Sequence, residues 1–417
     1  MRLKNIFGSF LAIFWLLYLP LEFLVWSRTA RYAVFGNIPL VETFSSLLND
    51  LLWLPLAVVL PIYLTVYAAK ISRRKIAKGL AYGVGIILFA GGVFHLNVYF
   101  RYLFYLMIPF FAFLFVDVVR HHKIRGYAFF YILALIGLIL NYQAQLIPKI
   151  EIGRNRVKKS LSVMSYNILV DQSKEKRLAA IELIRRQKPD LLFVQEIRTS
   201  DRKLLRRKLV DLYPYQHWSE KWENYNGGVI FSRIPFVSTR NTNIHTKYAK
   251  GHINLNHAVI QWHGRNIHLF NVHLYHGGNA LLKLIFGRMS PEQFLKDSES
   301  GYFRHIDEAK QIAERVSRVD EPVIFAGDFN DTPNSFVYHV FAKKLQNAFR
   351  TAGWGLGTTF GYISLINSVP SIFKPFVFNF LRIDHIFCSH HFKIVKSTVL
   401  HSNASDHEPQ IAVITLK

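Results

Sequence analysis

The chain has one cysteine, Cys388, among its 417 residues. A single thiol excludes an intrachain disulfide, and it also excludes a zinc site made of several thiolates. The sequence contains neither an internal repeat nor a low-complexity segment, so a repeat architecture is excluded as well. The lone cysteine does not indicate a cellular compartment.

Acidic residues are the other scarce class, with 27 Asp and Glu against 51 Lys and Arg. The imbalance persists in the C-terminal part, because residues 155–417 hold 36 basic and 22 acidic residues, an excess of +14. Such an excess favours an anionic partner, which can be nucleic acid, a phosphoinositide or an anionic membrane surface. A basic surface without a partner would show the same balance, so charge alone does not select among these.

Residues 1–150 contain five apolar runs that approach or reach the roughly 20 residues needed to cross a bilayer. Arg2 and Lys4 precede the first run as they would in a signal peptide, but four more runs follow, which favours a multi-span bundle. The region around Arg101 has alternatives, either a broken hairpin or one span with an interfacial segment. The runs are Phe7–Val25, Leu51–Ala69, Leu80–Val98, Tyr102–Val119 and Tyr127–Ile147.

The orientation of this predicted all-α transmembrane bundle follows from the Lys and Arg residues of its short loops. With the N-terminus inside, the outside loops hold only Arg28, Arg31 and Arg101, whereas the inside segments hold ten basic residues. Five spans then place the following domain, residues 157–417, outside the cytosol. The sequence therefore predicts a multi-pass integral membrane protein with an external C-terminal domain.

The pattern after the basic linker Pro148–Lys159 is that of an α/β layered sandwich rather than a regular βαβ repeat. A strand is expected at Leu161–Leu169, followed by an amphipathic helix at Lys174–Gln187 whose Leu178, Ile181 and Ile184 face inward. A basic helix is expected at Arg202–Leu212. The further expected strands are Asp190–Ile197, Gly228–Phe231, Ala258–Trp262, Ile267–His273, Pro322–Ala326, Ile383–Cys388 and Ile411–Leu416.

Several of these strands end or begin in polar residues that a strand does not need. Each has an ordinary explanation when taken alone, such as an Asx turn for Asp328 with Asn330 or a core histidine for His273. Together they suit phosphodiester hydrolysis, which needs a hard cation held by oxygen ligands, a positioned water and charge stabilisation. Oxygen ligands are available from Glu196, Asn167 and Asp406, and the other functions from Asp328, Asn330, Asp384 and His407.

The ordered motifs resemble the endonuclease/exonuclease/phosphatase family over residues 160–417. The resemblance implies a four-layer α/β sandwich in which two sheets pack face to face between helices. The motifs that carry it are Asn167, Gln195-Glu196, Gly228-Val229-Ile230-Phe231-Ser232-Arg233, His273-Leu274, Gly327-Asp328-Phe329-Asn330, Arg382-Ile383-Asp384-His385-Ile386-Phe387 and Ser405-Asp406-His407.

The same resemblance implies a role for each site residue. Glu196 would bind Mg²⁺ or Mn²⁺ with Asn167 and Asp406 nearby. Asp328, steadied by Asn330, would orient or deprotonate the attacking water. His407, paired with Asp384, would contact the scissile phosphate or act as base, while His273 would contact the phosphate or serve the leaving group. Arg382 is either a phosphate clamp or a strand-edge cation.

Two segments that flank the expected site bear on the substrate. Tyr275–Arg304 separates His273 from the next clear helix, and it contains the apolar stretch Ala280–Met289. Ile363–Phe380 is apolar and contains four phenylalanines. Exposed apolar surface of this kind marks an interaction site, so a lipid headgroup or lipid-linked phosphate at a bilayer is favoured as the phosphodiester substrate.

A membrane-tethered nuclease is the alternative, which the basic C-terminal domain favours. A non-catalytic binding module is disfavoured because every expected site position is filled.

Overall fold

The computed structural model describes residues 160–169, 173–219, 227–248, 252–275, 289–360, 381–402 and 404–417. The five predicted membrane spans lie outside these residues, as do the apolar stretches within 276–288 and 361–380. Within the described ranges, no helix combines the length and apolar character that crossing a membrane requires.

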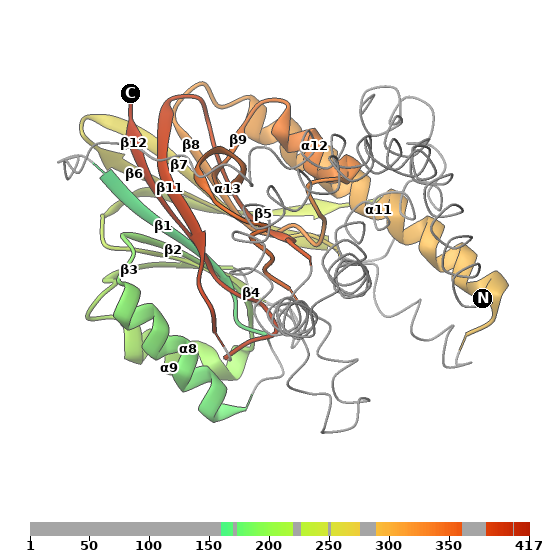
Figure 1. Cartoon of the computed structure of the whole chain (residues 1–417), viewed down its shortest axis with the longest axis horizontal. Helices are drawn as coiled ribbons and strands as arrows, with labels where there is room; N and C mark the ends of the chain where they lie inside the picture. The colour runs from blue at the N-terminus through green and yellow to red at the C-terminus, as the bar shows by residue number, and fades with distance from the viewer. Residues whose placement is uncertain are drawn as a thin grey trace, which may run out of the picture.

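Two six-stranded mixed sheets pack face to face (Figure 1), which confirms the predicted α/β sandwich. The first sheet has the order β11 (Phe392–Val399), β12 (Gln410–Leu416), β1 (Ser160–Asn167), β2 (Leu191–Ile197), β4 (Gly227–Ser232), β3 (Tyr215–Trp218). The second has the order β5 (Phe236–His245), β6 (His252–Trp262), β7 (Arg265–His273), β8 (Val323–Asp328), β10 (Asp384–Cys388), β9 (Gln346–Asn347).

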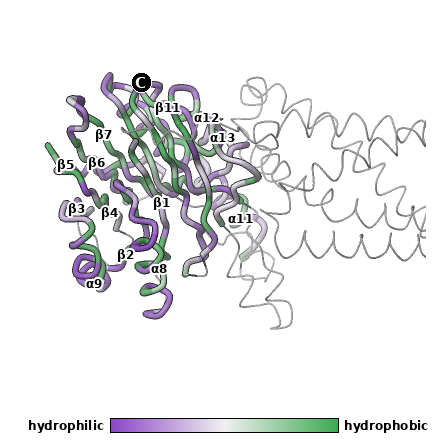
Figure 2. The backbone as a smooth tube through the Cα atoms, turned by 60° about the vertical axis from the view of Figure 1, so that its left-hand side comes forward, coloured by the Kyte–Doolittle hydropathy of each residue, from purple (hydrophilic) through white to green (hydrophobic). Residues whose placement is uncertain are grey.

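Helices cover the outer face of each sheet, as the four-layer prediction requires. On the first sheet, α8 (Lys174–Gln187) and α9 (Thr199–Leu209) pack apolar side chains onto β1, β2 and β4. The outer face of α9 is largely hydrophilic (Figure 2). On the second sheet, α11 (Pro291–Ser317) and α12 (Phe336–Ala342) pack onto β7, β8 and β10. A short helix, α13 (Ala348–Ala352), follows β9.

Side-chain alternation along the central strands decides which residues face the gap between the sheets. In β1, Leu161 and Val163 join the core between the sheets, whereas Met164 and Tyr166 pack against the helices. Asn167 has the same parity as Leu161, so it lies on the inner face. The same rule places the polar residues that end β7 and β8 and begin β10 on the inner face, beyond the last apolar core residues.

Three details differ from the sequence prediction. Leu178 was wrongly placed inward: it is 38% exposed, because the buried face of α8 is made by neighbours such as Ile181 and Ile184. The basic helix begins three residues earlier than expected, at Thr199, and ends at Leu209. Helix α11 begins at Pro291, well before Arg304, with the Ser290 side chain accepting a hydrogen bond from the Gln293 amide at its start.

Candidate active site

Three neighbouring strands of the second sheet end in one row of polar side chains. His273 of β7 is the register partner of Asp328 in β8, and Asp328 is the partner of Asp384 in β10. Gly327 makes the close approach of β7 and β8 possible, because a Cβ atom at this position would lie 2.0 Å from the carbonyl oxygen of Val272. The backbone of Gly327 also has a φ of 151°, which favours glycine.

Asn167 connects this row to the first sheet. Its Nδ2 atom donates hydrogen bonds of 2.9 Å to both Glu196 Oε1 and Asp328 Oδ2. Glu196 has a left-handed backbone (φ 59°) and lies where the β2–β4 register shifts. His273 Nε2 completes the group, 3.6 Å from each of the same two carboxylate oxygens. Two carboxylates from different sheets and one imidazole therefore converge at one end of the sandwich.

His407 forms the other side of the site. Its Nδ1 atom lies 2.8 Å from Asp384 Oδ2, its Nε2 atom lies 3.8 Å from Asp328 Oδ2, and its ring contacts Phe360. Burial alone would lower the pKa of His407, but the carboxylates of Asp384 and Asp328 outweigh burial and raise the pKa to about 10. The imidazole is therefore a cation at neutral pH, with Nε2 directed at the site.

Two carboxyl groups of the site have pKa values above the ordinary value for aspartate. Burial and the neighbouring Asp384 carboxylate raise the pKa of Asp328 to about 6, against the lowering effect of His407 and His273. Burial also raises the pKa of Asp406, and Glu196 adds to the rise despite the opposing charge of His407. Within the described residues, Asp384 Oδ1 is buried and has no hydrogen-bond partner. Negative charge at this site is thus incompletely compensated by the protein.

Asn330 and Arg382 occupy supporting positions. The Asn330 amide donates to Asp328 Oδ1 at 2.8 Å, and its side chain donates to the carbonyl of Leu274 at 2.9 Å. The expected Asx turn is therefore present, and it fixes Asp328 against the end of β7. Arg382 is 4% exposed, and its guanidinium carbon lies 4.8 Å from the ring centroid of Phe349.

Two groups of polar residues escaped the site prediction. Gln195 donates to Asn271 Oδ1 at 2.7 Å, and Asn271 in turn donates to the carbonyl of Val194, so this pair bridges the sheets beneath the site. Both are polar residues near the ends of strands that are otherwise apolar, and this is the signal that the sequence offers for them. Buried Glu308 accepts hydrogen bonds from the Tyr275 amide and from Arg304 Nε, both at 2.9 Å. No sequence signal indicated that α11 would hold the loop after His273.

A hard divalent cation fits the donor set of this site. Such cations prefer carboxylate and amide oxygens, and Glu196 and Asp328 bring two carboxylates to one place. Burial and neighbouring carboxylates raise the pKa of Asp328 and of Asp406 there, and a bound cation would offset this charge. Asp406 offers a further carboxylate close to Glu196. Asn167 presents its Nδ2 donor to Glu196, whereas its Oδ1 accepts a hydrogen bond of 3.0 Å from the Leu169 amide. The ligand atoms of Glu196, Asp328 and His273 all lie within 4.8 Å of one another.

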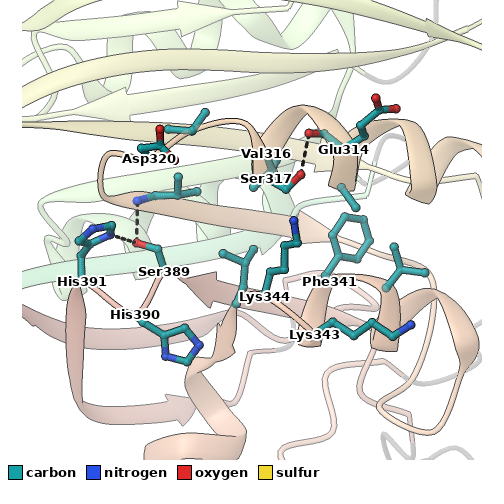
Figure 3. A pocket seen from close by; sticks show the side chains of 15 residues that line it. Glu314, Val316, Ser317, Asp320, Phe341, Lys343, Lys344, Ser389, His390 and His391 are labelled. Atoms are coloured by element: carbon teal, nitrogen blue, oxygen red, sulfur yellow. Dashed lines mark hydrogen bonds between the residues drawn. The ribbon is translucent and has the colours of Figure 1, made fainter. Parts of the chain in front are cut away.

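A groove of about 420 Å³ lies at the other end of the second sheet (Figure 3). It is lined by Val323, the first residue of β8, whereas the candidate site surrounds Asp328, the last. Six residues of strand span roughly 16 Å, so the groove is separate from the site. Lys343, Lys344 and Asp320 also line it, and none of the predicted site residues does.

Residues 164–407 match the model of the Endonuclease/Exonuclease/phosphatase family. Similar solved structures include truncated TDP2 from Caenorhabditis elegans, which is 20% identical with a TM-score of 0.45 and covers 61% of this chain and 98% of that chain. A structure of this family from Bacteroides vulgatus is 16% identical with a TM-score of 0.46, covering 62% and 100%. TDP2 from D. rerio, complexed with a single-strand DNA product, is 18% identical with a TM-score of 0.46, covering 61% and 99%. No curated protein matches the chain.

Proposed function

Because the chain belongs to the endonuclease/exonuclease/phosphatase family, we propose that it is a membrane-anchored phosphodiesterase that depends on Mg²⁺ or Mn²⁺. The observation that carries the proposal is the convergence of Glu196, Asp328, His273 and His407 at one end of the sandwich. Members of the family are typically metal-dependent hydrolases, and the carboxylates of this site provide the required oxygen ligands.

Glu196 would hold the metal ion, with Asn167 and Asp406 beside it. A bound divalent cation would polarise a phosphoryl oxygen and offset the charge that develops on it. The Asn167 amide holds Glu196 and Asp328 in a fixed relation, since it donates to both. Preorganised donors and charges of this kind lower a barrier because they need not rearrange during the reaction.

The pKa values of Asp328 and His407 support two different roles, one in proton transfer and the other in binding the phosphate. Asp328, with a pKa of about 6, is ionised at neutral pH and can accept a proton from the attacking water, while Asn330 keeps its carboxylate in place. His407, with a pKa of about 10, is protonated and would bind a phosphoryl oxygen through Nε2–H, held by Asp384 at Nδ1. His273 would contact the phosphate or the leaving group. The phosphate-clamping role of Arg382 stays a prediction.

A lipid headgroup or lipid-linked phosphate is the proposed substrate. Covalent attachment to five predicted membrane spans would keep the site near a bilayer, and the apolar segments Ala280–Met289 and Ile363–Phe380 adjoin the site residues in sequence. The charge asymmetry of the short loops supports a location of residues 157–417 outside the cytosol. A membrane-tethered nuclease is the second candidate, because residues 155–417 carry a net charge of +14, which suits nucleic acid.

The experiment is turnover of bis-p-nitrophenyl phosphate by the full chain in detergent, with Mg²⁺ and then with chelator. Activity should stop with chelator and fall by orders of magnitude in Asp328→Asn. A panel of phospholipids and sphingolipids, beside single- and double-stranded DNA, then separates the two substrates. Normal metal-independent turnover, or normal turnover in folded Asp328→Asn, would exclude this site assignment.

A further inference from the structure

Strands β5 and β6 stay paired beyond the last residues at which β6 pairs with β7. The β6–β7 register ends at Asn256 and Asn271, whereas β5 and β6 stay paired through Asn243–Asn254 to His245–His252. His273 lies two residues beyond Asn271 on the same face of β7, as Asn254 does relative to Asn256 on β6. The tip of the hairpin therefore extends the row of Asp384, Asp328 and His273 sideways across the sheet.

The side-chain amides of Asn256 and Asn271, which lie two residues further into the sandwich, are hydrogen-bonded to other side chains. Asn256 is 1% exposed and donates to Asn241 Oδ1 at 2.8 Å, and Asn241 donates to the carbonyl of Trp218 at 3.0 Å. Asn271 is likewise bonded to Gln195 of the opposite sheet. This inner row of amides joins the two sheets and leaves no room between them: a Cβ atom on Gly228 would lie 2.8 Å from both Asn256 and Asn271.

The next pair of amides repeats the pattern, but among the described residues it has no hydrogen bond to the opposite sheet. Asn254 Nδ2 donates to Asn243 Oδ1 at 3.0 Å. Asn254 Oδ1, however, accepts no hydrogen bond from the described residues although it is shielded from water, and Asn243 is exposed. A buried acceptor without a donor is costly, so its persistence suggests a ligand. His245 and His252 follow on the same face, with ring centroids 5.0 Å apart.

We infer that the Asn243–Asn254 pair, with the His245–His252 pair beside it, is a subsite for the hydroxyl-bearing group attached to the scissile phosphate. Neither pair contains Lys, Arg, Asp or Glu, whereas an anionic group would be met by cations. Carboxamides and imidazoles offer both donors and acceptors, which suits hydroxyls. The inference rests on the proposed function and deepens it: the favoured substrate is a phospholipid with a polyol headgroup, such as inositol or glycerol.

The test compares Asn254→Ala and Asn243→Ala with wild type, as the full chain in detergent–lipid micelles with Mg²⁺. The loss of one or two hydrogen bonds to substrate should lower kcat/KM on phosphatidylinositol or phosphatidylglycerol roughly tenfold in each variant. Turnover of bis-p-nitrophenyl phosphate, which has no hydroxyl, should stay within about twofold of wild type. Asn266→Ala is the matched control, since Asn266 is an asparagine at the opposite end of β7 whose side chain binds Glu321.

Each other outcome has a distinct meaning. Equal loss on both substrates would assign the amide pair a structural role, and no loss on either would remove the subsite; both leave the proposed function intact. Phosphatidylcholine and an RNA oligonucleotide are assayed beside these substrates. The inference would also be overturned if wild type preferred phosphatidylcholine, or if the two variants lost kcat/KM only on the RNA. Absence of turnover on every phosphodiester would instead reject the proposed function, and the subsite with it.

Discussion

Asp328→Asn should remove most of the activity and yet stabilise the metal-free protein. The carboxylate of Asp328 is 1% exposed, and burial together with Asp384 raises its pKa to about 6 from 3.8. Each pKa unit corresponds to about 1.4 kcal/mol, so the ionised carboxylate costs the folded state about 3 kcal/mol at pH 7. Asparagine has a similar size and carries no charge, so it avoids this cost.

Part of the gain is offset by a lost hydrogen bond. The oxygen of the new asparagine can still accept from Asn167 Nδ2. Its side-chain nitrogen, however, would face the Asn330 backbone N–H, which in wild type donates to Asp328 Oδ1. A lost hydrogen bond costs about 1 kcal/mol. The variant should therefore be about 2 kcal/mol more stable than wild type at pH 7 when no metal is present.

The pH dependence follows from the sign of the pKa change. Because the folded state binds the Asp328 proton more tightly than the unfolded chain does, wild-type stability from this group is present at low pH and is lost as pH rises from about 4 to about 6. The advantage of the variant should accordingly disappear near about pH 4.5. Mg²⁺ should stabilise wild type more than the variant, since the cation offsets the charge that the variant lacks.

The assay is urea unfolding of the full chain in detergent, with chelator, followed by protease cleavage of the C-terminal domain. Asp211→Asn is a control of opposite sign, because Arg185 lowers the pKa of the exposed Asp211 carboxyl. Lower stability of Asp328→Asn than wild type at pH 7, or an advantage that is the same at pH 7 and pH 4.5, would refute the electrostatic reasoning.

Three further predictions concern the protonation of His407, the membrane topology and the substrate. Asp384→Asn removes the strongest influence raising the pKa of His407, so the loss of kcat/KM at alkaline pH should begin at lower pH than in wild type; an unchanged pH–rate profile would argue against a protonated His407. A reporter that works only outside the cytosol should be active when fused after Lys417, and activity of a cytosol-dependent reporter there would mean that the span count or orientation is wrong. Replacing Phe373 and Phe376 by Ser should lower activity on bilayer lipid while sparing a small phosphodiester; equal loss on both substrates would indicate a folding role.

Strand positions were predictable from the sequence where apolar runs meet polar ends. The central strands are buried on both faces, so they appear as short apolar runs, and their inner-face parity places Asn167, Asp328 and Asp384 together. Helix α8 was predicted with its exact bounds because Ser173 caps one end and the apolar spacing is regular. The edge strand β5 was missed because Phe236–His245 is polar and mostly exposed.

Other features depend on packing that no local pattern records. The first ten residues of α11, from Pro291, bury none of their side chains, so they lack the apolar spacing of a helix. The pairing of Asn254 with Asn243 depends on the hairpin register, and the Gln195–Asn271 bridge depends on how the two sheets stack. The raised pKa values of Asp328 and His407 likewise arise only when strands distant in sequence bring their charges together.

The central claim is that Glu196 holds a divalent cation on which phosphodiester hydrolysis depends. Its most direct test is a Mg²⁺ titration of chelator-stripped full chain, measured as turnover of bis-p-nitrophenyl phosphate, for wild type, Glu196→Gln and the exposed control Glu182→Gln. Wild type and the control should be inactive without metal and should regain activity along the same saturable curve, whereas Glu196→Gln should lose about 10²–10³-fold in turnover, as expected for loss of a preorganised charge. Turnover without metal in wild type, or a Glu196→Gln curve that coincides with that of the control, would contradict the account.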